Sequence, residues 1–498
     1  MQKLVLNYLN DTVEKCPDKV AFSDGTLDLT FGDVYSISRK VGTYLHNSGI
    51  YHRPVVVYMN KSPKEVAAFL GIITGGDFYV PIDGEMPATR IRLILENVKS
   101  PLIICDEETI KQTEGFEEFG SKIVLFDELL DTGIDEDAID DIYRRMLDID
   151  PIYIVFTSGS TGVPKGVVAC HRSVVDYIEQ LCEIMHFDEN TVFGNQSPLF
   201  FDACLKEIYP TLKFGATAYL IPKKLFSTPF LLVEYLNEHK INTVCWVVSA
   251  LTMISAFGTF DDIKPEYLNN IAFGSEVFPL KQFRLWRKAL PEARFTNLYG
   301  PTETTGMCCY FRVEREIGDG EPIPIGQPFP NREIILLDEN DQPVTDGGQG
   351  EICIRGNSVT LGYYNDPERT AKAFVQNPLN KAYPEIIYRT GDIGCYNSRG
   401  ELTFVSRKDF QIKHMGHRIE LGEIEADASG IDGVQMTACV YNAEKKKICL
   451  YYVGTIAEAE LLAKLKDMLP RYMCPEKLVK LDALPVTPNG KIDRKALK

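Results

Sequence analysis

Apolar and polar residues alternate along the chain with two different periods. Short runs rich in β-branched residues, such as PVVVY at 54–58 and YIVF at 153–156, predict buried strands. Segments with apolar residues three and four positions apart, such as 29–47 and 172–185, predict amphipathic helices. Further strands are expected at 101–105, 123–126 and 243–248, and further helices at 63–73 and 88–97. This alternation predicts α/β layers with largely parallel strands.

The pattern changes towards the C-terminus. From about Glu333 the chain reads as hairpins separated by Asn, Asp and Gly, which predicts a β-rich subdomain. A separate α+β pattern follows, with helices near 422–428 and 456–469, strands near 435–441 and 448–453, and a Pro-rich extended tail. We place the main boundary near Asp409, which gives a large domain at 1–408 and a small one at 409–498.

Composition limits the class of protein. The 498 residues carry 53 Lys+Arg and 70 Asp+Glu, a net charge of −17, which argues against a nucleic acid as the main partner. Neither a secretory leader nor an apolar stretch of about 20 residues is visible, so we expect a cytoplasmic protein with no membrane role. The thirteen cysteines include adjacent Cys308 and Cys309, which are either a redox or metal site or, as we favour, reduced interior thiols.

The segment YIVFTSGSTGVPKG at 153–166 is the first chemical signal. A buried strand ends in small hydroxyl and glycine residues, and glycine lets backbone N–H groups approach phosphate oxygens closely. The spacing is not that of a Walker loop. Taken alone, the segment could also be a solvated turn. The candidate phosphate contacts are Thr157, Ser158, Gly159, Ser160, Thr161, Gly162 and Lys165.

Four more strings follow in order: NLYGPTETT at 297–305, YRTGD at 388–392, SRKD at 406–409 with GHRIELGEIE at 416–425, and TPNGKIDRK at 487–495. Together with 153–166, they resemble the motifs of adenylate-forming enzymes, the superfamily of acyl-CoA synthetases, nonribosomal peptide synthetase adenylation domains and beetle luciferase. The resemblance implies a large N-terminal α/β domain with a β-rich subdomain and a small mobile C-terminal α+β domain.

The resemblance also assigns roles in binding ATP and Mg²⁺. Tyr299 would stack on adenine beside Gly300, and Thr302 would approach the α-phosphate. Glu303 would hold Mg²⁺, and Asp392 would accept hydrogen bonds from the ribose hydroxyls. These residue types suit the chemistry, because an aromatic face fits a purine and a carboxylate is a hard oxygen ligand.

The remaining motif residues act on the reacting groups or move the small domain. By the same resemblance, Arg407 would contact ribose or α-phosphate and Asp409 would be the hinge. Lys491 would bridge the substrate carboxylate and the nucleotide, so Lys491, Lys165 and Thr302 are the candidate catalytic residues. His171, the one histidine close to the phosphate loop, is expected to be structural.

A substrate site is indicated by SPLFFDACLKEIY at 197–209. Asp202 resembles the aspartate that pairs with a substrate α-ammonium, although it could instead cap the following helix. Lys206 lies one helical turn further on, so both side chains could face the pocket. Lys206 could equally reach solvent or pair with a carboxylate near Glu207. The carried-over lining positions are Ala203, Lys206, Ser249, Ile271, Phe273, Leu298, Gly306 and Met307.

The sequence therefore predicts an AMP-forming ligase that activates an amino acid and releases pyrophosphate. The Ala203–Lys206 combination resembles pockets for glutamate-type side chains, so we expect a substrate with an acidic or other hydrogen-bond-accepting side chain. Seven residues follow Lys491, so the acceptor is expected to be the phosphopantetheine of a separate carrier protein, or coenzyme A. The alternatives are a D-alanine:D-alanyl carrier protein ligase, which 273–279 resembles, an acyl- or aryl-CoA synthetase, and a non-catalytic binding protein.

Overall fold

The computed structural model describes residues 2–159, 163–345, 347–443, 445–485 and 492–497. It divides into two units, the first made of 1–84, 99–155 and 167–406 and the second of 85–98, 156–166 and 407–498. The second unit thus takes up two short segments that precede its main part in sequence. The division into functional domains at 408/409 stays a prediction.

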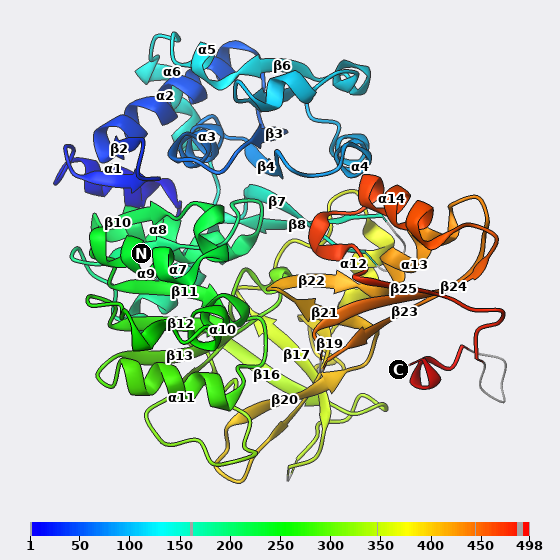
Figure 1. Ribbon diagram of the computed structural model, residues 1–498. Coiled ribbons are helices and arrows are strands. Elements are labelled where there is room, and N and C mark those ends of the chain that lie inside the picture. Colours follow the sequence, from blue (N-terminus) through cyan, green and yellow to red (C-terminus); the bar gives the residue numbers. More distant parts are fainter. Residues whose placement is uncertain (1, 160–162, 346, 444, 486–491, 498) are drawn as a thin grey trace. The chain divides into compact units, whose positions relative to one another are not determined.

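The first unit holds a six-stranded sheet in the order β6-β5-β3-β4-β7-β8 (Figure 1). The pairs of β3 with β4 and β5, of β4 with β7 and of β5 with β6 are all parallel, as the apolar runs predict. The strands are β3 (Pro54–Met59), β4 (Phe78–Asp83), β5 (Leu102–Cys105), β6 (Lys122–Leu125), β7 (Pro151–Thr157) and β8 (Lys165–Cys170).

Helices connect these strands, and their starts follow from local capping. α2 (Phe31–Asn47) begins with a capping box between Thr30 and Asp33, and α3 (Pro63–Thr74) begins after a Ser62 cap with Pro63 in its first turn. Eleven of the twelve α3 residues are buried, which is typical of a helix covered on all sides. The others are α5 (Phe126–Leu129), α6 (Glu136–Arg145), η1 (Thr109–Gln112) and η2 (Phe116–Phe119).

A nine-stranded sheet has the order β15-β14-β13-β12-β11-β9-β10-β1-β2. Its strands are β1 (Val20–Ser23), β2 (Asp28–Thr30), β9 (Val192–Asn195), β10 (Thr217–Leu220), β11 (Thr243–Val247), β12 (Asn270–Gly274), β13 (Arg294–Tyr299), β14 (Cys309–Arg312) and β15 (Gln327–Pro328). The central pairs are parallel, with Val247 opposite Gly274 and Gly274 opposite Leu298, so three carboxyl ends meet at one edge.

Helices pack on both sheets of the first unit. Side chains of α7 (His171–Met185) and α8 (Leu205–Phe214) join strand residues of both sheets in one large apolar cluster. A second cluster centres on Trp246 and Trp286, against α10 (Val248–Ala256) and α11 (Leu280–Ala289). The remaining short helices are α1 (Leu6–Val13), α9 (Pro229–Glu238), η3 (Asp202–Cys204), η4 (Lys223–Ser227), η5 (Thr259–Asp261) and η6 (Thr302–Thr304).

The hairpin-like region forms the predicted β-rich subdomain. Its five strands are β16 (Arg332–Leu337), β17 (Gly350–Gly356), β18 (Phe374–Gln376), β19 (Ile386–Tyr396) and β20 (Leu402–Arg407), with α12 (Pro367–Ala373) before β18. The pairs β16–β17, β17–β19 and β18–β19 are antiparallel. β19 carries Asp392 and so brings this residue of the YRTGD motif into the subdomain.

The second unit is α+β, as predicted. It contains the hairpin β21 (Gln411–His414) and β22 (His417–Glu420), the sheet β23 (Val434–Asn442), β24 (Lys447–Gly454) and β25 (Lys477–Lys480), and helices α13 (Leu421–Ser429), α14 (Glu458–Met468), η7 (Arg471–Met473) and η8 (Arg494–Ala496). α4 (Ala88–Val98) also belongs here and contacts α14. β25 pairs in parallel with β24, a pairing that the predicted extended tail did not specify.

Two expectations from composition concern membrane-spanning helices and the cysteines. In the part of the chain that the structure describes, no helix combines the length and the apolar character needed to cross a membrane. All thirteen cysteines are free thiols, and Cys308 and Cys309 are buried, which agrees with the prediction of interior thiols.

Candidate active site

Tyr299 and Asp392 meet in the interior of the first unit. Tyr299 ends β13, Asp392 lies on β19, and the Tyr299 hydroxyl donates to Asp392 Oδ2 at 2.6 Å. Burial, and then the charge of Asp392, raise the pKa of Tyr299 well above its usual value, so the phenol stays protonated and can donate this bond. The structure thus brings together the two residues that the sequence assigned to adenine and ribose.

The loop after Tyr299 folds back tightly on itself. Cys308 N–H donates to the Tyr299 carbonyl oxygen at 2.7 Å, which closes the turn. Gly306 has a φ of 76°, and a Cβ at this position would lie 2.6 Å from the Tyr177 ring. Only glycine satisfies both constraints without rearrangement, so Gly306 allows the loop to pass close to α7.

Glu303 lies in η6, within this loop, and is completely buried. Its Oε1 accepts a hydrogen bond from the Tyr363 hydroxyl at 2.8 Å, and its carbonyl oxygen accepts one from Thr360 N–H at 3.0 Å. A buried, oriented carboxylate is the hard oxygen donor that Mg²⁺ prefers. Among the described residues, no cluster of three or more His, Cys, Asp or Glu could hold a metal ion, so nucleotide and water oxygens would have to complete the coordination.

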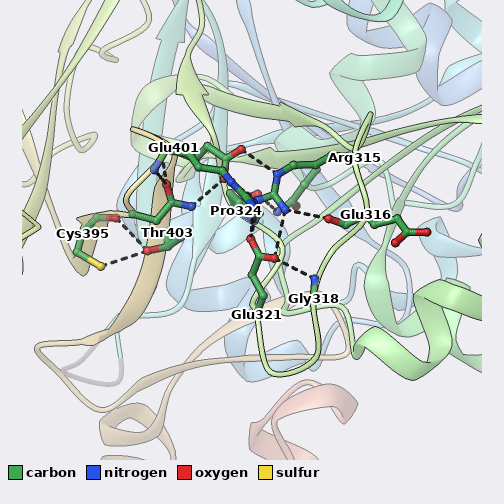
Figure 2. Close-up of polar contacts among 11 residues, drawn as sticks. Arg315, Glu316, Gly318, Glu321, Pro324, Cys395, Glu401 and Thr403 are labelled. Atoms are coloured by element: carbon green, nitrogen blue, oxygen red, sulfur yellow. Dashed lines mark hydrogen bonds and ion pairs between the residues drawn. The ribbon is translucent and has the colours of Figure 1, made fainter.

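An ion-pair network supports the strand that carries Tyr299. Figure 2 shows Arg315 between Glu321 and Glu401, with N–O distances of 2.6 and 2.7 Å. The loop held in this way presents the Pro324 carbonyl oxygen, which accepts a hydrogen bond from the Asn297 side chain at 2.8 Å. Asn297 is the first residue of the NLYGPTETT motif, so the network fixes the position of the start of this motif.

Asp202 and Lys206 lie at the start of α8, where η3 leads into the helix. Asp202 keeps part of its surface accessible, and burial raises the pKa of its carboxyl. The charge of Lys206, the Thr302 side chain and the Gly306 N–H all lower it again. The alternative that Asp202 caps the helix is wrong, because Phe201 and Cys204 occupy the cap positions of η3 and α8 without a side-chain cap.

Lys206 does not reach solvent, which was one of the alternatives left open. Its side chain is only 5% exposed. Among the residues that the structure describes, it forms no hydrogen bond and no ion pair, although its charge acts on the carboxyls of Asp202 and Glu207. The Lys206 side chain is therefore mostly covered, and its ammonium has no direct partner within the described residues.

The other carried-over pocket positions fall into two groups. Ala203 and Ser249 are partly accessible. Ala203 follows Asp202 in sequence, and Ser249 follows β11 at the carboxyl edge of the sheet. Ile271 and Phe273 lie in the apolar cluster around Trp246, where the Phe273 and Phe278 rings are 5.1 Å apart. Leu298 and Met307 are buried in the large cluster. Their role as pocket lining stays a prediction.

Several residues of this region were not singled out from the sequence. Glu276 Oε2 accepts the Ser249 N–H at 2.8 Å and so fixes the start of α10. Glu207 is completely buried beside Lys206, and Asn195 Nδ2 donates to its Oε2 at 3.3 Å. Lys61 donates to the carbonyl oxygens of Asn195 and Gln196. The sequence signal that could have identified Glu207 is its charge inside an apolar run.

The phosphate loop belongs to the second unit. Thr157 ends β7, and its buried Oγ1 has no hydrogen-bond partner within the described residues. Ser158 Oγ donates to the Arg418 carbonyl oxygen at 2.8 Å, and Gly159 N–H donates to Glu423 Oε2 at 3.0 Å. Lys165 is buried. Burial raises the pKa of Glu420, and the charges of Arg418 and Lys165 lower it only in part. Ser160, Thr161 and Gly162 lie outside the described residues.

Arg407 and Asp409 form a bidentate pair in the second unit. Arg407 Nε and Nη2 donate to the two Asp409 carboxylate oxygens at 2.6 and 2.8 Å. Burial alone would raise the pKa of Asp409, but the hydrogen bonds and charge of Arg407 outweigh it and lower the pKa. The candidate nucleotide-binding arginine is therefore held by the candidate hinge residue. Lys491 lies outside the described residues.

His171 is structural, as expected. It is buried, its Nδ1 accepts the Val5 N–H at 3.2 Å, and burial lowers its pKa to about 3. The imidazole is therefore uncharged at neutral pH, and its Nδ1 lone pair is used by the Val5 backbone.

Comparisons with known proteins identify the family of the chain. The model of the AMP-binding enzyme family matches residues 9–364. A D-alanine–D-alanyl carrier protein ligase of Bacillus licheniformis is 32% identical over 97% of this chain and 96% of its own length. Bacitracin synthase 1 of Bacillus licheniformis is 31% identical over 99% of this chain, which covers 9% of that much longer protein.

A solved structure shows the same fold. The Vibrio cholerae adenylation domain AlmE, crystallised with glycyl-adenosine-5'-phosphate, superposes with a TM-score of 0.85 at 21% identity, over 100% of this chain and 97% of that one. The family match extends over most of the chain and includes Tyr299, Glu303 and Asp202. The chain therefore belongs to the AMP-binding enzyme family of AMP-forming adenylating ligases.

Proposed function

We propose that this protein activates an amino acid as its aminoacyl adenylate, with release of pyrophosphate from ATP. The observation that carries the proposal is Asp202, a partly accessible carboxylate held next to Thr302 and Gly306 of the nucleotide loop. A free α-ammonium is a suitable partner for such a carboxylate, whereas a fatty or aryl acid has no use for it.

The remaining residues supply positioning and charge neutralisation. Tyr299 and Asp392 would hold the nucleoside, and Glu303 would hold Mg²⁺, which would neutralise phosphate charge when bound. Lys165 would support the phosphates, and Lys491 would bridge the substrate carboxylate and the nucleotide. The protein needs no nucleophile of its own, because the substrate carboxylate attacks the α-phosphorus and pyrophosphate leaves.

We further propose an amino acid with an acidic side chain as the substrate. The Lys206 side chain is 5% exposed and its ammonium has no ion pair within the described residues, so a substrate carboxylate would give it a direct partner in a largely covered site. A substrate carboxylate at Lys206, together with an α-ammonium at Asp202, would pair both charges. Lys206 would then orient the side chain while Asp202 orients the amine.

The acceptor in this proposal is the phosphopantetheine thiol of a separate carrier protein. A relative that matches the chain over almost its whole length is a carrier protein ligase by name, which supports a carrier rather than coenzyme A. The aminoacyl group would move from AMP to the thiol, with the thiol proton released and AMP as the leaving group.

The second candidate is D-alanine activation. The 32% identity to a D-alanine–D-alanyl carrier protein ligase favours it, and 273–279 resembles the corresponding stretch of such ligases. Lys206 argues against it, because a methyl side chain offers its ammonium no direct ion pair and leaves only the charge of Glu207 to balance it.

Amino-acid-dependent exchange of pyrophosphate into ATP tests these proposals. We expect L- or D-glutamate or aspartate to be preferred over alanine, and Lys206→Met to reduce that preference at least tenfold. Lys213→Met, on the same helix but paired with Glu179 at 2.7 Å, is the matched control. Preference for D-alanine that survives Lys206→Met would favour the second candidate, and turnover of acids without an amine would refute amino acid activation.

A further inference from the structure

Lys206 belongs to a buried charge cluster, defined here as Lys61, Asn195, Asp202, Lys206 and Glu207. The members come from the segment before α3, the end of β9, η3 and α8. Asp202 is partly accessible, whereas Lys206 and Glu207 are buried. The cluster thus has an open end at Asp202 and a closed end at Glu207, with Lys206 between them in sequence.

Glu207 is only partly satisfied at the closed end. Its Oε2 accepts from Asn195 Nδ2 at 3.3 Å. Its Oε1 is buried and has no hydrogen-bond partner within the described part of the chain. An oxygen in this position can either carry charge opposite Lys206 or carry a proton.

Lys61 fixes the other side of Asn195. Its ammonium donates to the Asn195 and Gln196 carbonyl oxygens at 3.1 and 3.3 Å. Lys61 therefore holds the end of β9 and is not free to pair directly with the substrate. Lys206 remains the cluster cation that a ligand entering at Asp202 could engage.

Charge balance differs between two classes of substrate. A neutral side chain adds only the α-ammonium charge beside Asp202, so Lys206 still needs Glu207 as its counter-charge. A carboxylate side chain supplies Lys206 with a new counter-charge, and Glu207 would then be a surplus anion in an environment without water. A proton on the unpartnered Oε1 of Glu207 is the simplest way to remove the surplus negative charge.

We propose that Glu207 is a specificity-determining residue that takes up one proton from solvent when a dicarboxylic amino acid binds through Lys206, an inference that rests on the proposed function. In the free protein Glu207 balances Lys206. In the complex the substrate carboxylate replaces Glu207 as the counter-charge of Lys206, and Glu207 becomes neutral.

The electrostatics of Glu207 agree with this exchange. Burial raises its pKa to about 7, and Lys206 is the largest of the influences that lower it, followed by Asn195 and Lys61. Neutralising Lys206 therefore raises the pKa of Glu207 further, so the proton is taken up on binding. The groups that interact with it are Lys61, Asn195, Cys204, Lys206, Tyr177 and Cys245, with Glu65 beyond Lys61.

Titration calorimetry of the full chain can count the proton. The probes are the non-reactive adenylate analogues 5'-O-(L-glutamylsulfamoyl)adenosine and 5'-O-(L-glutaminylsulfamoyl)adenosine, titrated at pH 7.5 (or about half a unit above the Glu207 pKa) in buffers of different ionisation enthalpy. We expect the glutamyl analogue to take up most of one proton and the glutaminyl analogue none. Glu207→Gln should abolish the uptake and retain binding of the glutamyl analogue.

A second measurement needs no variant. For the wild type, the glutamate to glutamine ratio of kcat/KM in pyrophosphate exchange should fall by up to about tenfold per pH unit above 7, because one more proton is bound in the glutamate complex. Binding of the glutamyl analogue without proton uptake, or uptake that survives Glu207→Gln, would overturn the role of Glu207 and leave the proposed function standing. Failure to bind or activate any acidic amino acid would overturn the proposed substrate class itself.

Discussion

Glu423 binds the backbone of Gly159 in the phosphate loop. Its Oε2 accepts the Gly159 N–H at 3.0 Å, and the Arg90 guanidinium pairs with Oε1. Arg90 and Glu423 are 6% and 1% exposed, so this ion pair is shielded from water. Three segments of the second unit, α4, the phosphate loop and α13, therefore depend on one carboxylate.

We expect Arg90→Ala to destabilise the second unit strongly. The variant leaves the Glu423 carboxylate buried with only the Gly159 N–H as a partner among those described here, and removing one member of a buried pair costs about 3–5 kcal/mol. Hydrogen–deuterium exchange over α4 and α13 reports this loss locally. Protection should fall by a factor of a hundred or more.

The control for Arg90 is an exposed bidentate pair. Arg172 donates to both oxygens of Asp148 at 2.8 Å, with side-chain exposures of 49% and 33%. Arg172→Ala should cost at most about 1 kcal/mol, because solvent screens the pair. Equal losses of stability for the two variants would show that burial does not increase the cost of breaking the Arg90–Glu423 pair.

We expect Tyr299→Phe to weaken both stability and nucleotide binding. The change removes the donor of the 2.6 Å bond and leaves Asp392 Oδ2 buried with less hydrogen bonding, which costs about 1–3 kcal/mol. The KM for ATP should rise severalfold in pyrophosphate exchange, while Tyr310→Phe, whose hydroxyl accepts a hydrogen bond from exposed Gln327, should change neither quantity. An unchanged melting temperature and KM would contradict the role given to the pair.

Element bounds could be predicted from the sequence because periodicity reports local burial. Helix 63–73 is observed as Pro63–Thr74 and strand 243–248 as Thr243–Val247. The order of the motifs also predicted a shared nucleotide site, and the structure places Tyr299 against Asp392. The element bounds follow from the residue pattern within each segment, and the shared nucleotide site follows from the resemblance of the motifs.

Partners that are distant in sequence could not be predicted in this way. Arg90 and Glu423 are 333 positions apart, and nothing in the periodicity of either helix identifies the other. Thr302 was assigned to the α-phosphate by resemblance, yet its side chain also acts on Asp202. Glu207 was visible as a charge inside an apolar helix, but its proximity to Asn195 depends on how β9 and α8 pack.

We expect Lys206→Met to move the acid limb of activity to higher pH. Lys206 is the largest influence that lowers the pKa of Asp202, so its removal raises that pKa, by about 1–3 units for a nearby charge. Asp202 must be ionised to pair with an α-ammonium, so a higher pKa means less active protein at pH 6. Pyrophosphate exchange with a neutral amino acid between pH 5 and 8 measures the shift, and Lys213→Met should leave the profile unchanged.

The Arg315 network predicts a stability difference that depends on pH. Hydrogen bonds from Arg315, and then from the Gly318 N–H, lower the pKa of Glu321 to about 2 from an ordinary value near 4.5. A carboxyl with a lowered pKa stabilises the fold above its unfolded-state pKa and loses that contribution as the pH falls towards 2. Arg315→Ala should therefore lower the free energy of unfolding by about 1 kcal/mol at pH 7, a modest value because the pair is partly solvated, and by roughly half of that or less near pH 3. High salt should reduce the difference at pH 7, and Arg284→Ala, at a pair with exposed Asp319, should show little effect at either pH. A loss for Arg315→Ala that is equal at both pH values would mean that packing of its side chain against Phe311, and not its charge, holds the loop beneath Asn297.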